Sequence, residues 1–587
     1  MNSIELLQNC VTRKDLARLL NCKPSHLSYV LYKISPASKY SQFSIDKKTG
    51  GKRTINAPTK DLKNIQKSLS QLLQNCIDDI NKIHGYKNSC AHGFVRERSI
   101  ITNAEVHKNQ KNVANIDLES FFESFNFGRV RGFFIKNKHF SLFEEVATTI
   151  AQIACYNNAL PQGSPCSPVI TNLITHSLDM RLIALAKQNS CLYTRYADDL
   201  TFSTRKKSFP EEILKEADGI FVPSKILKNE IRRAGFSINH KKTRVQYKDS
   251  RQDVTGLVVN KKVNIAKDYY RLTKAMCNSL FSNGFYTKKV GQEDIKGTIK
   301  ELYGRLNFID SVDEYNRKNY PEKLSIHYNH KNHGLRTRNL LNGREKTFSK
   351  FLFYKHFFAN DKVSLLCEGK TDNIYLKCAL DSIGNAYPKL VTPPVNGKEQ
   401  VNHLEMFKYS KRTRFLMELY GGSTYLGGFI QSYTERLSSY KKPLLLKPVI
   451  ILLDNDEGLT KQIKTEMKTA KSTIYINGQP VKSFDNNVKK ADFIHITHNL
   501  YAVLTPLALD GSDTMIEDFF EQQVLDREVN NRKFDPKETK EPKSDFYNKN
   551  TFATQVVEAD KANIKFDGFK PIFNRLTLVI EHFESLK

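Results

Sequence analysis

The sequence predicts a chain of several domains, α+β in its first part and α/β with a parallel sheet in its last part. Its 587 residues are too many for one hydrophobic core. The stretch CLYTRYADDLTFST, residues 191–204, alternates as a β-hairpin does and carries two adjacent carboxylates where the turn falls. Two largely apolar segments, 362–367 and 447–453, predict buried parallel strands covered by helices.

The charge of the chain is uneven along its length. Residues 1–350 hold 58 Lys and Arg against 32 Asp and Glu, a net charge of +26, whereas residues 351–587 hold 33 against 30, a net charge of +3. A segment as basic as the first is the electrostatic footprint of a protein that binds a polyanion. We therefore expect the first part to bind nucleic acid.

Residues 1–40 are predicted to form helices. Leucines recur there at helical spacing, and Thr12 and Pro24 are typical of helix starts. We interpret the segment as a helical layer packed on the domain that follows, with a DNA-binding helix-turn-helix as the alternative.

Carboxylates from two separate elements form the first candidate site. Asp117 ends a short apolar strand, and Asp198 and Asp199 lie at the predicted hairpin tip. An Asp pair alone is usually a solvated turn. Two-metal phosphoryl transfer, however, needs carboxylates from separate elements to bridge two cations, and Mg²⁺ prefers such ligands. Between the two elements, residues 160–173 predict a fixed Gly- and Pro-containing loop followed by a helix.

The order of these motifs resembles the palm of a reverse transcriptase. GGKRTINAP at 50–58 resembles the fingers hairpin of these enzymes, GFSINHKKTRV at 235–245 the palm segment before the thumb, and LYGRLNFIDSV at 302–312 a thumb helix. NAEVH at 103–107 and VTG at 254–256 resemble two signatures of retron reverse transcriptases. The resemblance covers roughly residues 1–320.

The resemblance implies an RNA-directed DNA polymerase with fingers, palm and thumb at 41–320, using Mg²⁺ or Mn²⁺ and deoxynucleoside triphosphates. Asp117, Asp198 and Asp199 would be its catalytic metal ligands, Lys52 and Arg53 would pair with the triphosphate, and Gln162 and Gly163 would press on the nascent base pair. Phe122 would exclude a 2′-OH, and Lys242 is a further candidate residue. Enzymes of this family copy part of their own structured noncoding RNA into DNA. Synthesis starts from an RNA 2′-OH and yields a branched RNA–DNA hybrid, the msDNA.

Residues 321–357 are predicted to be a basic linker or a thumb extension. They are rich in Asn, Lys, Arg and His. His327, His330 and His333 have no Cys or carboxylate at metal-ligand spacing, so we interpret them as solvated or backbone-contacting residues.

A second candidate site is predicted in the domain at 358–587. Glu368 follows one buried strand, and Asp454 and Asp456 follow another, at the carboxyl ends where open α/β sheets carry their sites. Such a cluster suits Mg²⁺ or Mn²⁺. The pattern EGxxD, which includes Asp372, followed by DxD resembles the Rossmann-like Toprim domain of topoisomerases, primases and overcoming-lysogenization-defect nucleases.

Further segments resemble the nuclease branch of that family. Residues 514–520 supply Glu517 and Asp518, and residues 548–553 supply Lys549, which would lie near the scissile phosphate. The long gap between the two strands implies an insertion at about 398–442. A topoisomerase would need a tyrosine on a separate breakage domain, for which the chain has no room, and primase remains an alternative.

The resemblances together imply a retron reverse transcriptase fused to a Toprim nuclease that acts in antiphage defence. Its target would be cellular RNA, tRNA included, or DNA, and a homo-oligomer is expected. One alternative is a group II intron-like or other cellular reverse transcriptase with a nucleic-acid-processing or binding C-terminal domain, and another is a binding scaffold with inactive sites. The two retron signatures disfavour the first, and the full set of carboxylates disfavours the second.

Cysteine usage and hydropathy indicate the compartment. None of the ten cysteines forms a CxxC pair, which argues against zinc and against a disulfide framework. The longest apolar stretch, near 444–453, is interrupted by Lys447 and Pro448 and is too short to span a bilayer. The first residues lack the apolar core of a signal peptide. We therefore expect a cytoplasmic protein with no membrane partner.

Overall fold

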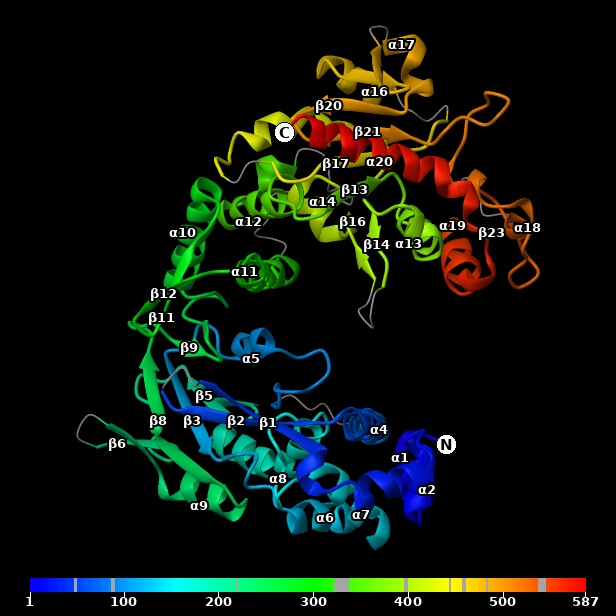
Figure 1. Ribbon diagram of the computed structural model, residues 1–587. Coiled ribbons are helices and arrows are strands. Elements are labelled where there is room, and N and C mark those ends of the chain that lie inside the picture. The colour runs from blue at the N-terminus through cyan, green and yellow to red at the C-terminus, as the bar shows by residue number, and fades with distance from the viewer. Residues whose placement is uncertain are drawn as a thin grey trace. The chain divides into compact units, whose positions relative to one another are not determined.

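The computed structural model describes residues 1–46, 50–85, 90–217, 220–320, 337–394, 400–442, 445–456, 461–481, 484–536 and 545–587. The chain forms two compact units, Met1–Ala266 and Lys267–Lys587, and is a mixed α/β multidomain protein (Figure 1).

The first unit begins with a layer of short helices. These are α1 (Ser3–Gln8), α2 (Arg13–Leu19), α3 (Pro24–Ser28) and the π-helical η1 (Tyr29–Lys33). Capping boxes at Asn2 and Thr12 begin the first two helices. The layer packs on α4 (Lys60–His84) and α7 (Glu144–Ala154), and the Arg13 N–H donates to Glu145 Oε1 at 3.0 Å.

A four-stranded antiparallel sheet lies at the centre of the first unit. Its strand order is β4-β5-β3-β8, formed by β4 (Cys191–Tyr196), β5 (Asp199–Thr204), β3 (Asn112–Glu119) and β8 (Ser237–Tyr247). The structure confirms the hairpin predicted at 191–204. The helices around it are α5 (Ile100–Val106), α6 (Phe127–Lys136), α8 (Ser167–Gln188) and α9 (Lys225–Arg233). Three smaller hairpins pair β1 (Tyr40–Asp46) with β2 (Lys52–Pro58), β6 (Leu214–Ala217) with β7 (Ile220–Pro223), and β9 (Asp253–Val254) with β10 (Leu257–Val258).

The second unit begins before the boundary expected from the sequence. Its first elements are α10 (Lys267–Asn283), the hairpin β11 (Thr287–Val290) and β12 (Glu293–Lys296), and α11 (Ile299–Asn319). α12 (Gly343–Phe353) and η6 (Tyr354–Phe358) occupy part of the predicted linker. Phe348, Phe351 and Phe357 are buried there, so this part is core and not linker. Because residues 321–357 are rich in polar and basic side chains, the apolar residues at helical spacing near the end of this segment were not recognised as a helix. His327, His330 and His333 lie outside the described residues.

A seven-stranded mixed sheet organises the rest of this unit. Its order is β16-β13-β17-β21-β20-β18-β19, with β16 (Leu404–Met406), β13 (Val363–Cys367), β17 (Val449–Leu453), β21 (Leu500–Leu504), β20 (Phe493–Thr497), β18 (Thr473–Ile476) and β19 (Gln479–Val481). The first four strands run parallel, as predicted for the two apolar runs, and the last three are antiparallel additions that the sequence did not indicate. β16 lies within the predicted insertion, so part of that segment is an edge strand of the sheet itself.

Helices cover both faces of this sheet. α13 (Asp372–Ile383) and α20 (Lys570–Ser585) pack on one face with Leu365 and Ile450, and α15 (Ser423–Leu437), α16 (Lys461–Thr469) and α12 pack on the other with Leu366 and Ile451 (Figure 1). The remaining elements are short: α14 (Lys411–Met417), α17 (Phe484–Asn487), α18 (Gln522–Leu525), α19 (Lys549–Thr551), and the pairs β14 (Val391–Thr392) with β15 (Val401–Asn402) and β22 (Lys533–Phe534) with β23 (Phe546–Tyr547).

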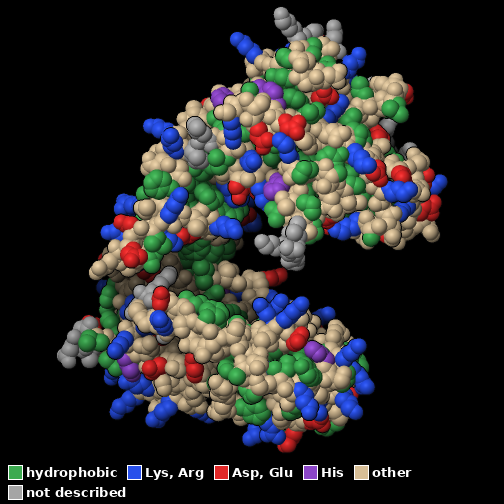
Figure 2. Space-filling model, in the orientation of Figure 1, with side chains coloured by type: hydrophobic (Ala, Val, Ile, Leu, Met, Phe, Trp, Pro, Cys, Tyr) green, Lys and Arg blue, Asp and Glu red, His purple; other side chains and the backbone are tan. Residues whose placement is uncertain are grey.

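Lys and Arg side chains lie over much of the face drawn in Figure 2, with Asp and Glu side chains between them. All ten cysteines are free thiols. Within the described ranges, no helix combines the length and the apolar character needed to cross a membrane.

Candidate active sites

The first site forms where two strands of the first unit bring three carboxylates together. Asp117 on β3 is paired in register with Asp199, the first residue of β5. The Leu118 N–H donates to the Asp198 carbonyl at 3.0 Å and ties the turn to β3. Asp117 is only 6% exposed. The backbone pairing thus gathers the predicted carboxylates Asp117, Asp198 and Asp199 at one edge of the sheet.

A buried ion pair holds the hairpin that carries the Asp pair. Arg195 on β4 donates to both carboxylate oxygens of Asp179 on α8, at 2.8 and 2.7 Å, and both side chains are fully buried. A third nitrogen of Arg195 donates to the Ala197 carbonyl at 3.2 Å. Ala197 has a φ of +56°, which the turn requires and its side chain disfavours. The pair therefore contributes to the conformation of the turn that carries Asp198.

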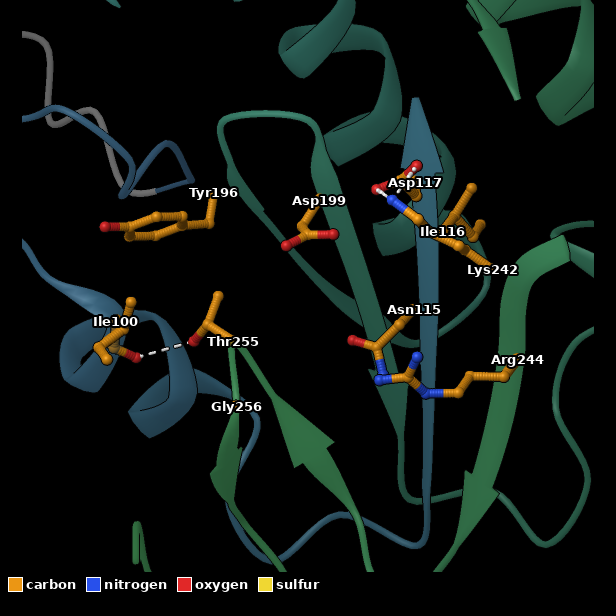
Figure 3. Close-up of a pocket in the computed structure, with 10 residues that line it drawn as sticks. All are labelled: Ile100, Asn115, Ile116, Asp117, Tyr196, Asp199, Lys242, Arg244, Thr255 and Gly256. Carbon is orange, nitrogen blue, oxygen red and sulfur yellow. Dashed lines mark hydrogen bonds and ion pairs between the residues drawn. The ribbon is translucent and has the colours of Figure 1, made fainter. Parts of the chain in front are cut away.

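Lys242 on β8 supplies the positive charge at this site. Its Nζ donates to both oxygens of Asp117, at 3.0 and 2.9 Å, and Figure 3 shows the two side chains pointing toward each other. Burial, with the charges of Asp198 and Asp117, raises the pKa of Asp199 to about 7. Burial and Asp117 also raise the pKa of Asp198. The hydrogen bond to Asp117 raises the pKa of Lys242. The site thus carries more negative charge than its lysine offsets.

A pocket of about 250 Å³ opens beside these carboxylates (Figure 3). Asp117, Asp199, Lys242 and Arg244 line it, together with Thr255 and Gly256 of the VTG signature. The Thr255 hydroxyl, from VTG, donates to the Ile100 carbonyl at 3.1 Å at the start of α5, the helix that carries NAEVH. The pocket is lined by both acidic and basic groups, which suits a phosphate-bearing strand next to bound cations.

The last residue of NAEVH is structural. His107 is fully buried, with one ring nitrogen 2.7 Å from the Ser203 hydroxyl and the other 2.7 Å from the Thr194 hydroxyl. Burial lowers its pKa to about 3, so the imidazole is neutral. Its hydrogen bonds join β4 and β5 behind the Asp pair.

The predicted loop at 160–173 contacts the β1–β2 hairpin. The Asn56 N–H on β2 donates to the Gln162 carbonyl at 2.8 Å. Gly163 has a φ of +117°, and a Cβ there would lie 2.7 Å from the Asn56 carbonyl oxygen, so only glycine fits. Lys52 and Arg53 are exposed on the same hairpin, and the charge of Arg53 acts on the pKa of Asp198. The half-buried Phe122 meets the ring of Phe94 edge-on at 6.5 Å.

The second site lies at the carboxyl ends of β13 and β17. Glu368 follows β13, Asp454 follows β17, and the two strands pair in parallel. Burial, with the charges of Asp456 and Asp372, raises the pKa of Glu368 to about 6. Burial and the charges of Asp372, Glu517 and Glu368 raise the pKa of Asp454 to about 8. These residues therefore lie within electrostatic reach of one another.

Glu517 and Lys549, from the two nuclease-like segments, join this cluster, and Asp518 does not. Lys549 Nζ donates to Glu517 Oε2 at 3.0 Å, and Glu517 is only 1% exposed. The Ile516 N–H donates to Asp454 Oδ1 at 2.9 Å, which brings the segment to β17. Asp518 instead is exposed and caps its own turn by accepting from the Met515 N–H at 2.7 Å. Asp372, at the start of α13, accepts from the Gly369 N–H at 2.7 Å.

Comparison with known proteins bears on the first unit. A family model described as "Reverse transcriptase (RNA-dependent DNA polymerase)" matches residues 45–264. The chain is 33% identical to the Retron Mx162 reverse transcriptase of Myxococcus xanthus, over 51% of this chain and 63% of that protein. It is also 33% identical to the Retron Ec86 reverse transcriptase of Escherichia coli, over 49% of this chain and 82% of that protein. The chain belongs to the retron reverse transcriptases.

This membership decides between two interpretations of the sequence, because the relatives are retron enzymes and not group II intron-like ones. The matched segments cover about half of this retron reverse transcriptase and just under two thirds of the Mx162 protein. A solved telomerase of Candida tropicalis superposes with a TM-score of 0.26 and 15% identity, over 40% of this chain and 56% of that chain.

The donor set of each site fits a divalent cation. As the side chains stand, no group of three or more His, Cys, Asp or Glu in the described part of the chain could hold a metal ion. Both sites nevertheless concentrate carboxylates whose pKa values are raised by burial and by one another. A hard cation would offset that charge. Asp117, Asp198 and Asp199 would hold it in the first site, and Glu368, Asp454 and Asp456 in the second.

Some site residues were not found from the sequence. Arg195 and Asp179 lie 16 positions apart on a strand and a helix, and only the fold shows that they pair. Arg244 and Asn115 line the pocket from adjacent strands. Arg244 is two residues after Lys242 on β8, and this spacing of two on a strand is the signal that could have indicated it.

Proposed function

We propose that residues 41–320, with the predicted fingers, palm and thumb, form an RNA-directed DNA polymerase that copies a cognate structured noncoding RNA into msDNA. The register pairing of Asp117 with Asp199, within a chain of the retron family, is the observation that carries this proposal. Lys52 and Arg53 would bind the incoming deoxynucleoside triphosphate, and Gln162 and Gly163 would contact the nascent base pair. Mg²⁺ or Mn²⁺ would lower the pKa of the attacking hydroxyl and offset charge on the leaving pyrophosphate.

Asp198→Asn tests the polymerase. We expect primer extension to fall by roughly 100-fold or more, because charge stabilisation of the transition state is lost. Asp249→Asn removes the same charge from an exposed turn and should leave extension unchanged. Normal extension by Asp198→Asn protein would reject the assignment.

We propose that Phe122 selects deoxyribonucleotides over ribonucleotides. Its ring, half-buried beside Phe94, would lie against the 2′ position of the incoming nucleotide. Phe122→Ala should raise incorporation of ribonucleotides relative to deoxynucleotides, measured with single nucleotides. An unchanged ratio would mean that the ring only packs.

We further propose that residues 358–587 form a Toprim-like, metal-dependent nuclease. The ion pair of Lys549 with the buried Glu517, next to Asp454, supports this. Lys549 would neutralise a phosphate oxygen at the scissile bond. Glu368→Gln and Asp454→Asn should each abolish cleavage of RNA or DNA by the full chain. Asp361→Asn, an exposed control on the same unit, should not.

We propose an antiphage role in which msDNA restrains the nuclease. A ligand can restrain it only by binding the inactive state more tightly. The protein is expressed with its noncoding RNA, the DNA branch is digested, and cleavage of cellular RNA, tRNA included, and DNA is followed. Cleavage should appear after digestion and be lost in Glu368→Gln protein. Equal cleavage before and after digestion would contradict restraint by msDNA.

A further inference from the structure

An aromatic and basic cluster on the second unit has no part in the sites above. Tyr420 lies between α14 and α15 and is partly exposed. Lys370 Nζ donates to the Tyr420 hydroxyl at 2.8 Å, and the Arg414 guanidinium carbon lies 5.1 Å from the Tyr420 ring centre. Tyr425 meets Tyr420 edge-on at 6.2 Å and also lies near Arg414, at 5.5 Å. Two cations thus surround a pair of partly exposed rings.

The backbone fixes this cluster next to Glu368. The Gly422 N–H donates to the Glu368 carbonyl at 3.0 Å. Gly421 has a φ of +88°, and a Cβ there would lie 2.6 Å from the same carbonyl oxygen, so the loop requires glycine to come this close. Lys370 is only two residues after Glu368 in the chain. A nucleic-acid strand bound at the cluster would therefore pass close to the carboxylates of the second site.

The electrostatics of the cluster suit an anionic ligand. The hydrogen bond from Lys370, with the charges of Lys370, Arg414 and Lys411, lowers the pKa of the Tyr420 phenol despite an opposing effect of burial. Aromatic faces bind unpaired bases by stacking, whereas paired bases in a duplex do not present their faces. Lysine and arginine beside the ring bind the adjoining phosphates.

We propose that Tyr420, with Lys370 and Arg414, is a stacking platform that binds an unpaired base of a nucleic-acid strand next to Glu368. The inference rests on the proposed nuclease function and specifies its substrate as single-stranded. Tyr420 stacks on the base, while Lys370 and Arg414 contact the flanking phosphates. Duplexes bind the platform poorly because their bases stay stacked on one another.

The chain contains no tryptophan, so a single introduced tryptophan reports on one position. The first experiment uses the full chain carrying Glu368→Gln, to prevent cleavage, and Tyr420→Trp. It is titrated with dT₁₂, rU₁₂ and a 12-base-pair DNA duplex. We expect both single strands to quench the tryptophan fluorescence, and the duplex to leave it nearly unchanged. The dT₁₂ and rU₁₂ arms distinguish DNA from RNA as the preferred strand.

Two controls separate stacking from general charge attraction. Leu586→Trp places the tryptophan at the end of α20. There Lys587 Nζ donates to the carbonyl of Leu446, which precedes β17, so this position lies at the opposite end of the sheet from Asp454. It should not respond. Adding Lys370→Met or Arg414→Met to the reporter should weaken binding in the quenching titration about tenfold. Lys377→Met removes an equal charge from an exposed position of α13 and should not.

The second experiment uses the active chain. Tyr420→Leu should raise KM for single-strand cleavage about tenfold with little change in kcat, and Tyr420→Phe should keep KM near that of the parent, because the ring is retained. Quenching by duplex and single strands alike, no quenching by either, or an unchanged KM in Tyr420→Leu protein would overturn the platform. Quenching by single strands without any cleavage by the parent would instead overturn the nuclease and leave the platform standing.

Discussion

Arg195 and Asp179 show how far a single buried pair can determine the geometry of a turn. Both side chains are excluded from solvent, and Arg195 also donates to the carbonyl of Ala197 in the turn before Asp198. Breaking one half of a buried pair leaves an unpaired charge in the interior, which costs more than removing both halves.

We expect Asp179→Asn to lower the free energy of unfolding of the first unit by about 3–5 kcal/mol. The double variant Asp179→Leu with Arg195→Met should lose clearly less, because no charge is left unpaired. Urea unfolding followed by circular dichroism measures both. If the double variant is less stable than Asp179→Asn, the penalty is not one of an unpaired buried charge.

His107 makes the stability of the first unit depend on pH. Its pKa in the folded chain is about 3, below the ordinary value of 6.5, so the unfolded chain takes up the proton first as pH falls. The contribution is fully present above about pH 6.5 and is lost as pH falls toward the folded pKa. Between pH 7.5 and 5.5 the loss from this group should be about 1.4 kcal/mol.

His107→Gln removes the titration and keeps a hydrogen-bonding side chain. Its unfolding free energy should therefore fall less between pH 7.5 and 5.5 than that of the parent. Urea unfolding at the two pH values gives the difference. His26→Gln, on α3, is the matched control and should keep the parental dependence. An equal slope in His107→Gln and the parent would show that the imidazole is not held neutral.

Among individual residues, those in motifs could be predicted from the sequence, whereas the residues that hold them in place could not. The places of Asp117, Asp198 and Asp199 on a strand and in a turn could be predicted because the patterns around them are strong, and their metal-binding role stays a prediction. In the sequence, nothing distinguishes Arg195 and Asp179 from other basic and acidic residues, and only the fold shows that they form an ion pair. Asp518 was predicted from its place in a motif, yet its side chain caps its own turn because Met515 offers a nearer N–H donor.

Among the elements, the loop at 160–173 depends on one glycine. Gly163 combines a left-handed φ with a close approach to the Asn56 carbonyl on β2. Gly163→Ala should separate the loop from the β1–β2 hairpin and raise KM for deoxynucleoside triphosphates in primer extension. It should also speed hydrogen exchange at the Asn56 amide, a readout that does not need polymerase activity. Gly132→Ala, in open space on α6, should change neither. Unchanged exchange in Gly163→Ala protein would contradict the coupling.

Local patterns predicted the elements unevenly. The hairpin at 191–204 and the strands before Glu368 and Asp454 were predictable because alternation and buried apolar runs are strong signals. The antiparallel strands β20, β18 and β19 were not, because short strands have weak periodicity and their pairing is decided by tertiary contacts. α12 was assigned to a linker because basic and polar residues precede its apolar stripe.

For the whole molecule, net charge should govern nucleic-acid binding. Residues 1–350 carry +26, and a protein that displaces counterions from six or more phosphates loses about a thousandfold in affinity between 50 and 200 mM salt. We expect the full chain to show that dependence in filter binding to structured RNA. Asp454→Asn, in the nearly neutral second part, should leave the slope unchanged. A nearly flat dependence would mean that phosphate contacts are few.

The core that joins α10, α11 and α12 to the second sheet has a consequence for how such proteins can be divided or recombined. Arg412 on α14 pairs with Asp310 on α11, Arg317 on α11 pairs with Glu345 on α12, and Phe281 shares a core with Tyr440. Cleaving or recombining the gene at residue 320, where the family resemblance ends, would expose apolar surface on both fragments. We therefore expect an exchange of the second sheet between such proteins to keep both folded only if the crossover falls near residue 266, with the helices after it inherited together with the sheet.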